Sequence, residues 1–96
     1  MDKKEAKTIL DKKLKELQSH SWDEFQSWIA CKKVEVYEEE GQSGAKYQIE
    51  IEAMWDDKPD DWIRVIAGID DGGLVSSFSP ITSDFLIAKD GSMETE

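Results

Sequence analysis

The stretch that decides the fold is residues 55–81, which read WDDKPDDWIRVIAGIDDGGLVSSFSPI. A polar loop containing Pro59 leads into the apolar run 62–69, and that run ends at Asp70-Asp71-Gly72-Gly73. Glycine adopts a positive φ without steric cost and aspartate tolerates one, so Asp71-Gly72 fits the centre of a tight hairpin turn. The stretch therefore predicts two antiparallel strands, 62–69 and 74–78. The stretch specifies backbone geometry and does not indicate a catalytic or binding site.

Two further strands precede this hairpin. Apolar and polar residues alternate through 34–40 and again through 47–55, with the turn 41–44 between them. A period of two is typical of strands that bury one face. In the strand 62–69, one face is purely apolar and is predicted to face the helices; it consists of Ile63, Val65, Ala67 and Ile69.

The first third of the chain has the period of helices. Apolar residues recur at steps of three and four from Ala6 to Leu17, which predicts an amphipathic helix over about 3–19. The run 21–24 (Ser-Trp-Asp-Glu) matches a capping box and predicts a second helix from Trp22 to about Ala30. One bent helix broken near His20 is the alternative.

The C-terminal segment carries a different signal. Pro80 is expected to end the last strand, Thr82-Ser83-Asp84 to start a short helix through Ile87, and residues 91–96 to fray. The fold class is therefore α+β: two N-terminal helices packed on one face of an antiparallel β-meander of three to four strands, with a short C-terminal helix. The whole chain, 1–96, is expected to form a single domain.

Charge divides the chain unevenly. Residues 1–33 carry eight Lys and six acidic residues, a net charge of +2, whereas residues 34–96 carry four basic and sixteen acidic residues, a net charge of −12. So acidic a domain repels phosphate backbones, which disfavours nucleic-acid binding and favours a basic protein partner or plain solubility. The apolar runs are too short to cross a membrane, and no secretory leader precedes the first helix, so we expect a cytoplasmic protein.

The residues of catalysis and metal binding do not form a recognisable set. His20 is the single histidine and Cys31 the single cysteine, and neither has a nucleophile or base at a suggestive spacing. The acidic clusters lie in separate turns without the alternation of a calcium loop, and Gly72-Gly73 joins two strands instead of cradling a phosphate before a helix. We expect no enzyme, no metal and no cofactor.

The best candidate site is the sheet face turned away from the helices. Aromatic residues, Met and Arg are enriched at protein interfaces, and the chain has one arginine. The candidate interaction surface comprises Tyr37, Met54, Trp62, Arg64 and Ile66. The alternative is that the C-terminal segment, with Phe78, Ile81, Phe85 and Leu86, folds over this face and makes it core.

The same segments carry a resemblance. A Tyr-x-Ile-Glu segment, a Trp-Asp-Asp step, an Arg-Val-Ile-x-x-Ile-Asp-Asp-Gly-Gly hairpin and a Pro-hydrophobic-Ser/Thr stretch leading to Phe occur here as Tyr47 to Glu50, Trp55 to Asp57, Arg64 to Gly73, and Pro80 to Thr82 with Phe85. This pattern, over about half the chain, resembles a group of small uncharacterised bacterial proteins. Leu74-Val75 departs from it, because such proteins often have an aromatic residue after the double glycine. The resemblance implies the same fold and no known activity.

The sequence therefore predicts a small acidic cytoplasmic protein–protein interaction module without catalytic activity. The alternative is a small-ligand or metal-binding domain. The expected partner is a protein, with a basic protein as one form of it, and neither nucleic acid nor a membrane is expected to bind.

Overall fold

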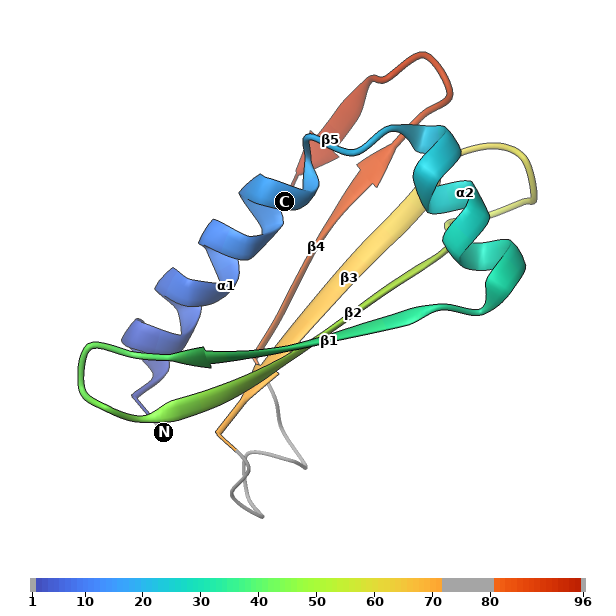
Figure 1. The fold of residues 1–96 in the computed structure, drawn as a ribbon. Coiled ribbons are helices and arrows are strands. Elements are labelled where there is room, and N and C mark those ends of the chain that lie inside the picture. The colour runs from blue at the N-terminus through green and yellow to red at the C-terminus, as the bar shows by residue number, and fades with distance from the viewer. Residues whose placement is uncertain (1, 72–80, 96) are drawn as a thin grey trace.

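The computed structural model describes residues 2–71 and 81–95. The fold is α+β, with two helices, α1 (Lys3–Leu17) and α2 (Trp22–Cys31), followed by an antiparallel sheet. The sheet order is β1-β2-β3-β4-β5, so each strand pairs with its neighbour in sequence (Figure 1). The strands are β1 (Val34–Glu40), β2 (Lys46–Trp55), β3 (Ile63–Asp70), β4 (Ile81–Ile87) and β5 (Met93–Thr95).

Local capping sets the helix boundaries. The side chain of Asp2 accepts a hydrogen bond from the amide of Glu5 (3.0 Å) at the start of α1. Ser21 accepts from the amide of Glu24 (3.2 Å) at the start of α2, as the capping box predicts. The chain leaves α2 at Lys32, which adopts the left-handed conformation at φ 55°. Two separate helices are thus confirmed, and the single bent helix is wrong.

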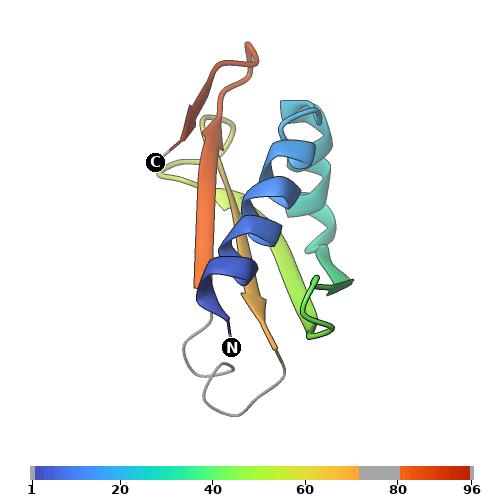
Figure 2. The same ribbon diagram turned by 90° about the vertical axis from the view of Figure 1, so that its left-hand side faces the viewer.

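Both helices lie on the same side of the sheet (Figure 2). Helix α1 packs over β3 and β4, and α2 packs over β2 and β3. Alternation along the strands sends one set of side chains into this interface, which is the predicted helix-facing set on β2 and β3. Among the residues that the structure describes, the buried core consists of Ala6, Leu10, Leu14, Leu17, Trp22, Phe25, Trp28, Tyr47, Ile49, Ile51, Ile63, Val65, Ala67, Ile69, Phe85 and Ile87.

Aromatic contacts join the two layers. Phe25 of α2 meets Phe85 of β4 edge-on, with 5.9 Å between the ring centroids. Trp22 lies 5.9 Å from Trp55 between ring centroids, and its indole N–H donates to the backbone carbonyl of Asp61 (2.8 Å). These contacts tie α2 to the sheet and to the 56–62 connection, so the position of the second helix is fixed by packing and by one polar contact.

The C-terminal segment differs from the prediction. Residues 82–87, predicted as a short helix, belong to strand β4, where Phe85 pairs with Val65 and Ile87 with Ile63. Residues 93–95, predicted to fray, form β5 and pair with β4. Pairing with β3 overrides the local helix-start signal because it buries Phe85 and Ile87 together. The predicted strand 74–78 lies outside the described residues.

A polar clasp connects the first helix to the first hairpin. The carboxylate of Glu5 accepts hydrogen bonds from the Ser43 hydroxyl (2.8 Å), the Ser43 amide (3.2 Å) and the Tyr47 hydroxyl (2.8 Å). These donors lower the pKa of Glu5, and the bond to the Glu5 carboxylate raises the pKa of Tyr47 to about 12. A side chain at Gly41 would collide with Glu5, since its Cβ would lie 2.0 Å from Oε1.

The assigned core face predicts a difference between two strands. Replacing Ile51, which is fully buried, with Ala should lower the free energy of unfolding by about 2–5 kcal/mol, because a cavity remains in a small core. The matched change at Val36, 50% exposed on the neighbouring strand, should stay within about 0.5 kcal/mol. Urea unfolding followed by tryptophan fluorescence measures both. Equal effects of the two changes would contradict the register.

The clasp predicts a pH dependence at the alkaline end. The folded-state pKa of Tyr47 is raised from its ordinary 10 to about 12, so the stabilisation is complete below pH 10 and is lost as the pH rises through 12. In Tyr37→Phe, which leaves a single tyrosine, the tyrosinate absorption should therefore appear near pH 12. Adding Glu5→Gln should move that midpoint back toward 10. A midpoint unaffected by Glu5→Gln would show that the clasp does not hold in solution.

Candidate functional site: the open face of the sheet

The open face is defined here as the side of the sheet that points away from α1 and α2. Strand alternation and the pairing registers assign its members, because paired residues share a face. They are Val34, Val36, Glu38 and Glu40 from β1; Lys46, Gln48, Glu50, Glu52 and Met54 from β2; Arg64, Ile66, Gly68 and Asp70 from β3; Thr82, Asp84 and Leu86 from β4; and Glu94 from β5.

Exposed apolar residues gather on this face. The large hydrophobic side chains most exposed in the described part of the chain are Val34 (51%), Val36 (50%) and Met54 (37%), and all three belong to the open face. Ile66 of β3 is half-buried; it is the diagonal neighbour of Met54 and is separated from Val34 by Glu52. These four apolar side chains, called the apolar strip below, lie on β1, β2 and β3 and surround Glu50 and Glu52 of β2.

Three of the five predicted site residues lie on the open face: Met54, Arg64 and Ile66. Trp62 is half-buried and lies just before β3, where its carbonyl accepts a hydrogen bond from the Asp56 amide (3.0 Å). Because Trp62 is outside the paired strand, the register does not assign it to either face.

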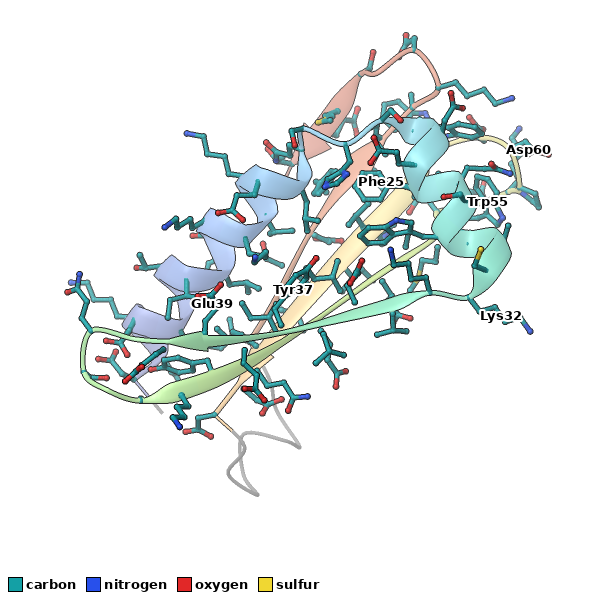
Figure 3. All side chains as sticks on the ribbon, viewed as in Figure 1. Phe25, Lys32, Tyr37, Glu39, Trp55 and Asp60 are labelled. Carbon is teal, nitrogen blue, oxygen red and sulfur yellow. The ribbon has the colours of Figure 1, made fainter. Side chains whose placement is uncertain are left out.

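Tyr37 was assigned to the wrong face. It pairs with Ile49 on the helix side of the sheet, and the ammonium of Lys13 lies 4.2 Å from the centroid of its ring. Figure 3 shows Tyr37 and Glu39 extending from β1 toward α1. The open face of β1 instead carries Val34 and Val36, although their apolar character predicts that they point toward the helices. On the same side of β1, the ammonium of Lys13 lies 3.8 Å from the carboxylate of Glu39.

The alternative that the C-terminal segment covers this face is wrong for two of its members. Ile81 pairs with Ile69 and Phe85 with Val65, so both lie on the helix side and pack against the core. Leu86 lies on the open face beside Arg64 and contributes to it. Phe78 is outside the described residues.

Arg64 is already neutralised within the molecule. Its Nε and Nη2 donate to Oδ1 of Asp56 at 3.0 and 2.7 Å, and its Nη1 donates to Asp84. The carboxylates of Asp56 and then Asp84 raise the pKa of Arg64, which stays cationic. The arginine thus joins β4 to the end of β2 and is not available to balance other acids.

Glu50 and Glu52 differ from Arg64 in that their charges are not paired. Both are exposed, and neither has an ion pair or side-chain hydrogen bond among the residues that the structure describes. Glu50 lies between Val36 and Gly68, and Glu52 between Val34 and Ile66, so no neighbour in either cross-strand row is cationic. Two uncompensated carboxylates therefore stand inside an apolar strip.

Shallow hollows mark the surface at three places of interest. One of about 250 Å³ lies on the open face and is lined by Val34, Glu50, Ile51, Glu52, Ile66, Gly68 and Thr82. A larger one of about 390 Å³ lies where the end of β1 meets the start of β2, and one of about 370 Å³ lies between the start of α1 and Gly41-Gln42; the linings of both are mainly charged or polar. All three are open to solvent, unlike the enclosed apolar pockets in which small ligands are usually buried.

The histidine, cysteine and acidic side chains of the described residues are dispersed. No group of three or more His, Cys, Asp or Glu residues there lies in an arrangement that would hold a metal ion. His20 bonds to Glu24 and lies beside the rings of Phe25 and Trp28, at centroid distances of 5.8 and 6.2 Å, which accounts for it as a residue of the helix junction. None of the described helices is long and apolar enough to span a bilayer.

Comparison with known proteins adds no relative to this description. No protein-family model, curated protein or solved structure matches the chain. The open face must therefore be interpreted from its own geometry and charge.

The acidic turns predict no specific calcium response. Among the described residues, their carboxylates are not grouped around a common point where a metal ion could bind, and Asp56 is already paired with Arg64. Millimolar calcium should therefore leave the melting temperature almost unchanged in thermal unfolding, apart from the effect of ionic strength matched with sodium chloride. A rise of many degrees with calcium alone, as mass action produces at a tight site, would contradict this.

Proposed function

We propose that this protein is a non-catalytic protein-interaction module of the cytoplasm, and that its open face binds a basic protein. The observation that carries the proposal is the coincidence, on one face, of the most exposed hydrophobic side chains of the described residues with two carboxylates that have no cationic residue in their cross-strand rows. Either feature alone is ordinary at a protein surface. Together they resemble an interface with apolar contacts and a charged rim.

The apolar strip supplies the contact area in this proposal. Val34, Val36 and Met54 are exposed and are not needed to fill the core, so a partner that covers them removes apolar surface from water. Their positions on adjacent strands β1 and β2 fix them rigidly relative to one another. A rigid surface loses little conformational entropy on binding, which favours affinity.

The charges select the partner. On the open face, acidic residues outnumber basic ones, and Arg64 is held by Asp56 and Asp84. An acidic partner would bring further like charge against Glu50 and Glu52, whereas a basic one compensates them. Complementary charge also steers the encounter, so association should be faster at low ionic strength.

A defined probe tests the proposal: a short peptide of alternating lysine and valine titrated into isotope-labelled protein. NMR shifts should concentrate on β1, β2 and β3 and leave the exposed surface of α1 unmoved, and binding should weaken as salt increases. The double variant Val34→Ser, Val36→Ser should weaken binding severalfold, because it removes apolar contact from exposed positions.

Ala30→Ser is the matched control, since Ala30 is exposed on α2 away from the open face. It should bind the peptide as the unmodified protein does. Shifts spread evenly over all acidic segments, including 56–61, would indicate unspecific attraction and contradict the proposal. So would a double variant whose affinity equals that of the unmodified protein.

A further inference from the structure

Gly68 is one of the residues that line the hollow on the open face. It is in the middle of β3, paired with Glu50 on one side and Thr82 on the other. Glycine weakens the interior of a strand, because it has more conformational freedom to lose and no side chain to pack. A glycine at this position therefore calls for a reason.

Neither the backbone nor the packing supplies that reason. The glycines with positive φ among the described residues are Gly44 and Gly91, so the conformation of Gly68 is open to any residue. A Cβ at Gly68 would meet Thr82 Cγ2 at 3.5 Å and the Ile81 carbonyl at 3.9 Å, which are ordinary van der Waals distances. What the missing side chain does provide is space, namely the hollow of about 250 Å³.

The walls and rim of this hollow differ in chemistry. Val34, Ile66 and Thr82 line it with aliphatic groups, and the exposed carboxylates of Glu50 and Glu52 stand beside them. Arg64 is the diagonal neighbour of Glu52 on β3, but Asp56 and Asp84 hold it. The hollow thus combines an apolar channel with uncompensated negative charge.

We infer that the hollow over Gly68 seats one long basic side chain of the partner, a lysine or an arginine. The methylene stem lies against Ile66 and Thr82, and the cation lies between Glu50 and Glu52. Long basic side chains bury their stems on apolar surface while the charge stays in water, so this geometry suits them. The inference rests on the proposed function and adds the residue type that the face recognises.

Filling the hollow is the direct test. Gly68→Val introduces a β-branched side chain that strands favour, so the protein should fold with an unchanged or higher melting temperature and bind the lysine–valine peptide at least tenfold more weakly. In Gly68→Ala the added Cβ makes only ordinary van der Waals contacts, and the affinity for the peptide should fall less. This variant replaces Gly68→Val in the test if the valine variant does not fold. Unchanged affinity in a folded Gly68→Val protein would overturn the inference.

Charge is tested with matched amide variants. Glu50→Gln and Glu52→Gln keep the shape and remove the charge beside the hollow, and each should weaken binding severalfold. Glu38→Gln removes the same charge from the open face on β1, away from the hollow lining, and should have a clearly smaller effect. Equal losses in all three would mean general attraction to an acidic face and would overturn the inference.

The peptide itself distinguishes the parts of the contact. Replacing its lysines with norleucine or acetyl-lysine keeps a long chain without the cation and should abolish binding, and an arginine version shows which basic group fits better. Intermolecular NOEs from the lysine methylenes to the methyl groups of Ile66 and Thr82 should be observed; their absence in a bound complex counts against the hollow.

If the peptide binds through Val34 and Val36 and its affinity is unchanged in Gly68→Val, the inference fails and the proposed function stands. If the unmodified protein does not bind any basic peptide at the open face, both fail.

Discussion

The structure depends on the burial of one face of the sheet under two helices. Ile51, Val65 and Phe25 are excluded from solvent, and every apolar Å² removed from water contributes roughly 25 cal/mol. Slipping either central strand by one residue would exchange this face for the charged one, so the core fixes the register of β2 and β3. Pairing then carries that register outward to β1 and β4, including residues that touch no helix.

The same register determines which residues lie on the open face, but these residues do not have to pack in the core. Side chains there do not fill the core, so folding alone requires neither an apolar strip nor a particular charge. Met54 remains exposed, and Gly68 leaves a gap where an alanine would make only ordinary contacts. Features that weaken a strand or expose apolar area without serving the core are the ones most reasonably attributed to binding. This separation of roles is why changes to the two faces should have different effects.

Local patterns were sufficient wherever the pattern and the burial agreed. Helical spacing and capping predicted both helices, and strict alternation predicted β2 and β3 together with Met54 and Ile66 of the open face. The failures occur where long-range pairing decides. At residues 82–84 a helix-start signal was overridden by pairing with β3, and on the edge strand β1 the register turned Tyr37 toward Lys13 of α1. Sequence reasoning had no access to that register, since nothing local distinguishes the two faces of an edge strand.

The charge pattern also bears on what can approach the open face. Acidic residues outnumber basic ones on the open face and its β1 edge, and they include Glu38, Glu40, Glu50 and Glu52. Like charges opposite one another destabilise strand pairing, and charged residues are a common protection of sheet edges. Arg64 offers no relief, because breaking its bonds to Asp56 and Asp84 would expose two further carboxylates. The acids beside the apolar strip therefore disfavour pairing of the open face with the open face of a second copy.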